Sequence, residues 1–171
     1  MDLTPERRSV QRADLDRRMR DEVELEGILA DRVPDWYGTL LSSIILAAGD
    51  AHVLYLSASF VVDGSAFSTV VALFTQKLCI HATVSGDEGQ VRSDPVVTAV
   101  PRSSLRSLHV SSDCDVFDDD GAPWPGTIRL VLMYRGGRSV TLPLAATRSA
   151  AAGAELHSLV DTSRGTLEQT A

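Results

Sequence analysis

The chain has 171 residues, 44% of them hydrophobic, and a net charge of −7. This composition predicts a folded domain with an extension and excludes global disorder, and its acidity disfavours nucleic acid or an anionic membrane as the main partner. Two cysteines, Cys79 and Cys114, are too few for a disulfide framework, so we expect thiols in a reducing compartment. The chain shows no signal-peptide pattern and no apolar run of the roughly 20 residues that cross a bilayer, so we expect a cytoplasmic protein.

The first predicted element is a charged helix over residues 5–31, with Pro5 at its first position and Val33-Pro34 at its end. Its apolar residues recur every four positions and form a narrow stripe with no obvious need inside the chain. Six arginines stand among the first 20 residues, so the helix could dock on an acidic partner, a second copy or nucleic acid. The candidate partner-binding residues are Arg8, Arg12, Leu15, Met19 and Val23. In the alternative that we favour for the arginines, acids at neighbouring turns balance them, namely Asp14, Asp16, Asp21 and Glu22.

A second helix is predicted over residues 35–48, because Asp35 can cap it and its apolar side chains form a broad face. From His52 the hydrophobic period changes to two, which predicts strands at 53–62, 67–74, 78–84, 96–100, 105–110, 127–134 and 139–144. Asp63-Gly64 and Arg135-Gly136-Gly137-Arg138 are typical of tight hairpin turns. A last helix is predicted over 145–162, followed by a loose tail at 164–171.

These elements predict an α+β fold in which N-terminal helices precede about seven antiparallel strands and a C-terminal helix closes the sheet. The segments Ser68–Ile80 and Val100–Leu108, with the closing hairpin and Ala154–Val160, resemble bacterial pleckstrin-homology-like (PH-like) domains. The resemblance implies a half-open barrel over residues 33–163, preceded by the charged helical extension at 1–32.

A narrower resemblance links Trp36-Tyr37 and the strand pair around Phe60–Gly64 to an actinobacterial family of unknown function. The preference for Arg over Lys, with Lys77 as the single lysine, also resembles proteins of GC-rich genomes such as those of actinobacteria. Neither observation implies an activity.

Two groups of residues could bind metal. Cys79 and His81 share one face of a strand and could join His109 and Cys114 in a zinc site, but the spacing matches no standard finger. Acidic residues gather at 113–120, yet Val116 breaks the spacing of a calcium loop. We favour structural roles for the first group and a solvated loop for the second, with weak cation binding by the loop as the alternative.

No nucleophile elbow and no phosphate-binding loop occurs in the sequence. The first hairpin loop is acidic at Asp63, which disfavours phosphoinositides, and Lys77, Arg102, Arg106 and Arg129 are scattered in a way typical of solvated surface. We therefore expect a non-enzymatic PH-like interaction or scaffold domain, without cofactor or metal, that contacts a protein partner or self-associates as a homo-oligomer. The alternative is a small-molecule-binding protein or minor enzyme with a pocket between the sheet and the helix at 35–48.

Overall fold

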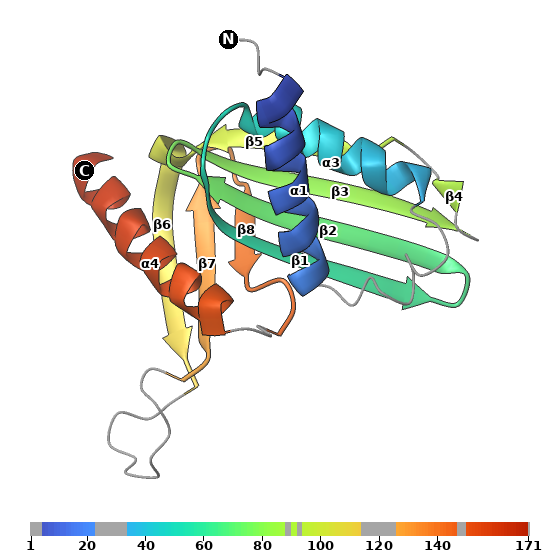
Figure 1. Cartoon of the computed structure of the whole chain (residues 1–171). Coiled ribbons are helices and arrows are strands. Elements are labelled where there is room, and N and C mark those ends of the chain that lie inside the picture. The colour runs from blue at the N-terminus through green and yellow to red at the C-terminus, as the bar shows by residue number, and fades with distance from the viewer. Residues whose placement is uncertain are drawn as a thin grey trace.

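The computed structural model describes residues 5–22, 34–87, 90–91, 94–113, 126–146 and 150–170. Within these ranges the chain forms three α-helices, α1 (Pro5–Glu22), α3 (Asp35–Ala48) and α4 (Ala150–Thr170), together with two antiparallel sheets (Figure 1). The predicted α+β class is confirmed. The two sheets do not close into one another, as in a half-open barrel, and the last helix packs beside them.

The first sheet, called sheet A, has five strands: β1 (Val53–Asp63), β2 (Ala66–Thr75), β3 (Leu78–Asp87), β4 (Gln90–Val91) and β5 (Val96–Pro101). A long hairpin joins β1 to β2, and its turn contains Gly64 at φ +61°, a conformation that glycine adopts without steric cost. β2 pairs with one edge of β3, and β5 pairs with its other edge. The two-residue β4 pairs with the last residues of β3.

Helices α1 and α3 cover one face of sheet A. Leu40 and Ile44 of α3 are fully buried against inward-facing apolar residues of β1, β2 and β3, such as Leu73 and Ile80. Leu15 and Met19 of α1 enter the same cluster. The charged N-terminal helix therefore packs on its own domain.

The second sheet, called sheet B, contains β6 (Leu105–Ser112), β7 (Ile128–Tyr134) and β8 (Ser139–Leu142). A short 3₁₀ helix, η1 (Arg102–Ser104), connects the two sheets. Sheet B, α4 and the opposite face of sheet A enclose a second core, to which sheet A contributes Tyr55, Ala72, Phe74 and Cys79. The hydroxyl of Ser57 in β1 accepts a hydrogen bond from the backbone N–H of Leu144 at 2.9 Å, which fixes the end of β8 against sheet A.

The strand predictions are confirmed to within a few residues, and the helix at 35–48 is confirmed at both ends. The C-terminal helix was placed wrongly: Ala145 and Ala146 are not helical, and α4 continues to Thr170 through most of the predicted tail. Gly165 weakens a helix but does not end this one, because Leu167 beyond it still packs on the second core. Residues 23–31 of the first predicted helix lie outside the described residues.

Candidate interaction surface

In strands β1, β2, β3 and β5, successive side chains point alternately to the two faces of sheet A. One face is packed under α1 and α3, and sheet B covers the other face only at one end. Beyond that end, nine side chains form a surface that we call the open face. Its residues are Ser59, Val61, Ser68, Val70, His81, Thr83, Ser85, Val96 and Thr98, all of them exposed or half-exposed.

The open face carries no formally charged side chain. Val61 and Val96 are 58% and 59% exposed, and the remaining positions are mostly hydroxyl-bearing or β-branched. The solvated face of an antiparallel sheet is normally polar, and loss of charged residues together with retained apolar ones is typical of the centre of a protein interface. The sequence of this face therefore favours contact with another protein surface.

Among the described residues, acidic side chains stand at one end of the open face and a basic one stands on sheet B at the other. Asp63 and Asp87 lie opposite one another across β2 at the hairpin end, where the hydroxyl of Ser65 donates to the Asp87 carboxylate. Arg138, in the turn between β7 and β8, marks the end covered by sheet B. Burial, with a smaller contribution from the charge of Arg138, lowers the pKa of His81, the open-face residue of β3 that follows the covered Cys79 by two positions.

The residues of α1 that were predicted to bind a partner do not form one exposed surface among the described residues. Leu15 and Met19 are 4% and 0% exposed in the chain's own core, so in this conformation they cannot contact a partner. Arg12 is exposed. Arg8 lies within α1 but its side chain is outside the described part of the chain, as is Val23. Partner binding by this helix stays a prediction, but its apolar stripe has a sufficient role in cis.

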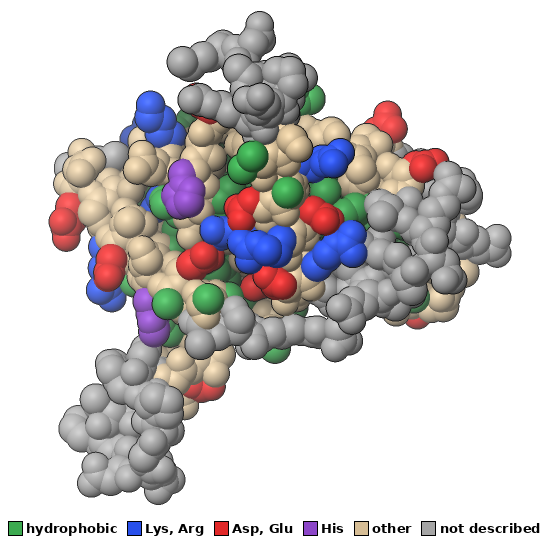
Figure 2. Space-filling model, viewed as in Figure 1, with side chains coloured by type: hydrophobic (Ala, Val, Ile, Leu, Met, Phe, Trp, Pro, Cys, Tyr) green, Lys and Arg blue, Asp and Glu red, His purple; other side chains and the backbone are tan. Residues whose placement is uncertain are grey.

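Arg17, Arg18 and Arg20 of α1 are balanced by acids of the same helix. Arg17 pairs with Asp14 at 2.7 Å and with Asp21 at 3.3 Å, and Arg20 pairs with Asp16 at 3.1 Å. Partial burial opposes ionisation of Asp14, but the hydrogen bond from Arg17 and the charge of Arg18 outweigh it and lower the pKa of this carboxyl. Figure 2 shows the resulting surface, on which basic and acidic side chains are interleaved.

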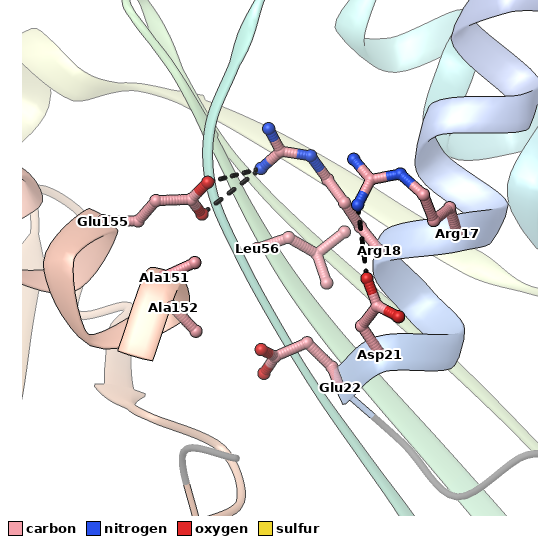
Figure 3. A pocket seen from close by; sticks show the side chains of 8 residues that line it. All are labelled: Arg17, Arg18, Asp21, Glu22, Leu56, Ala151, Ala152 and Glu155. Atoms are coloured by element: carbon pink, nitrogen blue, oxygen red, sulfur yellow. Dashed lines mark hydrogen bonds and ion pairs between the residues drawn. The ribbon is translucent and has the colours of Figure 1, made fainter. Parts of the chain in front are cut away.

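A cavity of about 260 Å³ lies between α1, β1 and the start of α4 (Figure 3). Arg18 spans its rim and donates to both carboxylate oxygens of Glu155, at 3.1 and 3.2 Å. Leu56 and Ala152 form part of its apolar wall. The charges of Arg18 and Glu155 at the rim already neutralise one another. We therefore read this ion pair as a structural link between α1 and α4.

A buried polar cluster lies where the two sheets and α4 meet. Arg102 is 5% exposed, and its guanidinium donates to the carbonyl oxygen of Thr75 at 3.1 Å and to the hydroxyl of Thr162 at 2.8 Å, with a longer contact of 3.4 Å to Ser163. Burial lowers its pKa, and in the described ranges no carboxylate forms an ion pair with it. The interpretation of Arg102 as solvated surface was therefore wrong: it joins β2, η1 and α4.

The same cluster contains the one cysteine of the described residues. Cys79 is 1% exposed, and burial raises the pKa of its thiol to about 11 even though Tyr134 hydrogen-bonds to it. Burial also raises the pKa of Tyr134 well above its ordinary value. A thiol that is protonated at neutral pH and shielded from solvent is a poor nucleophile. This arrangement favours packing and disfavours catalysis.

The predicted zinc group is not brought together in the described part of the chain, where no three His, Cys, Asp or Glu side chains could share a metal ion. Cys79 is enclosed by the second core, whereas His109 is exposed on β6. Cys114 and most of the acidic segment 113–120 lie outside the described residues. No helix among those described is long and apolar enough to cross a membrane.

The space between sheet A and α3, where the alternative prediction placed a pocket, is filled by side chains. The Trp36 ring stacks on Phe67 with centroids 5.1 Å apart, and Leu40 and Ile44 have no exposed surface. A ligand could enter here only if α3 moved away from the sheet.

The open face itself was missed at the level of sequence, although a signal for it exists. From Val53 to Pro101, the charged residues within β1, β2, β3 and β5 are Asp63 and Asp87. These two acids are the last residues of their strands, so the four strands carry no charge along the rest of their length. The solvated face of an antiparallel sheet is normally rich in polar and charged residues, and these strands do not supply one. Comparisons with protein-family models, with curated proteins and with solved structures found no match.

Proposed function

We propose that this protein is a non-enzymatic interaction domain of the PH-like type, which contacts another protein through the open face of sheet A. The observation that carries the proposal is the uncharged surface around Val61, Thr83 and Val96, on a chain whose net charge is −7. Such a face disfavours nucleic acid, which requires basic side chains at its phosphates. The order of the strands and the C-terminal helix supports the PH-like assignment.

A photocrosslinking amino acid at Val96 tests this proposal in cells that express the full chain. Leu46 provides the matched position, because it is also apolar, is 81% exposed and lies on α3, over the other face of sheet A. We expect protein adducts from position 96 that Val61→Lys abolishes and Val62→Lys leaves intact. Val61 and Val62 are neighbours on β1, both 58% exposed, and point to opposite faces.

Equal adducts from positions 96 and 46, or adducts that survive Val61→Lys, would refute the proposal. Gel mass identifies adducts between two copies of the chain, since their mass is twice 18.4 kDa. Adducts of any other mass indicate a different protein partner at the same face.

A further inference from the structure

We infer that the partner of the open face is a second copy of this chain, stacked face to face with its strands antiparallel to those of the first. The inference rests on the proposed function of this face and adds the identity and orientation of the partner. Three features support it: the distribution of charge, the step between the two sheets and the small size of the side chains.

The distribution of charge favours the open face over the rest of the surface as the site of self-association. Two copies that each carry a net charge of −7 repel one another. They can approach most closely where neither surface is charged, and the open face supplies nine adjacent uncharged side chains. Its ends also determine the orientation: Asp63 and Asp87 lie at one end, and Arg138 stands in the β7–β8 turn of sheet B, which covers the other end. A two-fold axis parallel to the face and perpendicular to the strands brings the acidic end of each copy to the basic end of its partner.

The step between the two sheets gives the same orientation. Figure 1 shows β1, β2 and β3 reaching well past sheet B, which covers only their other end. Facing sheets pack about 10 Å apart, so sheet B and a stacked partner sheet would occupy the same layer. In the antiparallel arrangement the β1–β2 hairpin of each copy lies beside sheet B of the other, so the two do not compete for this layer.

The side chains of the open face are small and similar in height, with valine, serine and threonine at most positions. Such side chains leave no tall projection that would hold a second sheet away from this face. Strands spaced about 4.8 Å apart and about 20 Å of length give an area on the order of 300–400 Å² per copy, below the roughly 800 Å² of a standard interface. The dimer is accordingly weak and reversible.

Sedimentation equilibrium of the full chain, from micromolar concentrations to about 1 mM, tests the inference over the range expected for so small an interface. We expect a monomer–dimer equilibrium that Val61→Lys weakens by at least about tenfold, since it buries an uncompensated charge, and that Val62→Lys leaves within about twofold. A wild-type chain that stays monomeric throughout this range would overturn the inference.

Charge reversal tests the orientation. Asp63→Arg and Arg138→Asp each create two like-charged contacts in an antiparallel dimer, so each variant alone should be monomeric where the wild type dimerises. A mixture of the two variants restores both attractions and should form a heterodimer, as should the double variant with itself. Both exchanged residues are exposed, which protects the fold from the substitutions. A mixture that associates no better than either variant alone contradicts the antiparallel dimer.

The two proposals can fail separately. If the chain is monomeric, yet position 96 still gives adducts with another protein that Val61→Lys removes, then the open face is an interface for a different partner. If the chain dimerises but Val61→Lys has no effect, then self-association uses another surface and this inference is wrong, while the adducts from position 96 still decide the proposed function.

Discussion

Replacement of Arg102 by methionine removes a buried positive charge that the described structure pairs only with neutral oxygens. The substitution keeps most of the side-chain volume and abandons no buried carboxylate. It does leave the carbonyl oxygen of Thr75 without this donor, whereas the hydroxyl of Thr162 still donates to carbonyl oxygens of its own helix at 3.0 and 3.2 Å.

The expected cost follows from these contacts. A hydrogen bond from a charged donor is worth about 1.5–3 kcal/mol, and a buried acceptor left unpaired costs about 1–3 kcal/mol. Release of the guanidinium from a poorly solvated site offsets part of this loss, because burial lowers the pKa of Arg102. We expect Arg102→Met to lower the free energy of unfolding by about 2–3 kcal/mol.

Arg102→Lys sharpens the test. A lysine keeps the charge and its desolvation cost, but its compact ammonium group cannot span the three oxygens that the planar guanidinium reaches. We therefore expect Arg102→Lys to destabilise the protein at least as much as Arg102→Met. Urea denaturation with linear extrapolation measures both, and exposed Arg106→Met serves as a control that should stay within about 0.5 kcal/mol of wild type. If Arg102→Met costs clearly more than Arg102→Lys, the positive charge at this site stabilises the fold by itself and the reasoning is refuted.

Other substitutions test α1, the open face and the second core. Met19→Ala should lower the free energy of unfolding, measured in urea, by about 2–4 kcal/mol, because Met19 has no exposed surface. Exposed Arg12→Ala should lower it by less than about 0.5 kcal/mol, and equal losses would contradict packing of α1 on its own chain. Burial lowers the pKa of His81 below its ordinary value of 6.5, so the unfolded chain binds this proton more readily and stability should fall as the pH drops below 6.5. His81→Gln should reduce the loss of unfolding free energy between pH 7.5 and pH 5.5, as measured by urea titration. With Cys114→Ser present, labelling of Cys79 by a thiol reagent at pH 8 should require unfolding and accelerate with urea, because its pKa is about 11; rapid labelling that is independent of urea would contradict its burial.

Local patterns predicted most of the secondary structure, because the physics that sets them is local. The turn at Gly136 and Gly137 has φ angles of +85° and +77°, values that glycine adopts freely, and the flanking strands alternate as their sequence indicates. The helix at 35–48 has a broad apolar face and ends at Gly49, so its bounds could also be predicted.

The errors occurred where a contact distant in sequence decides the structure. Arg102 follows Pro101 in a break between strands, and its burial depends on a helix about 60 residues further along the chain. The continuation of α4 past Gly165 depends on packing of Leu167 against sheet residues. The open face was missed for the same reason, since only the crossing of sheet B determines which part of sheet A stays uncovered.

The arrangement of charge reverses the functional interpretation of the N-terminal helix. In the sequence, the apolar stripe of α1 looks in need of a partner, whereas neighbouring acids are expected to balance its arginines, and the strands look like ordinary core. In the structure, Arg17, Arg18 and Arg20 pair with acids of the chain, and Leu15 and Met19 are buried in it. A surface whose charges are already paired gains little from a partner, because association would have to replace solvent and existing ion pairs. The uncharged face of sheet A has no such contacts to give up, so burial of its valines and threonines by another sheet is the association that these side chains favour.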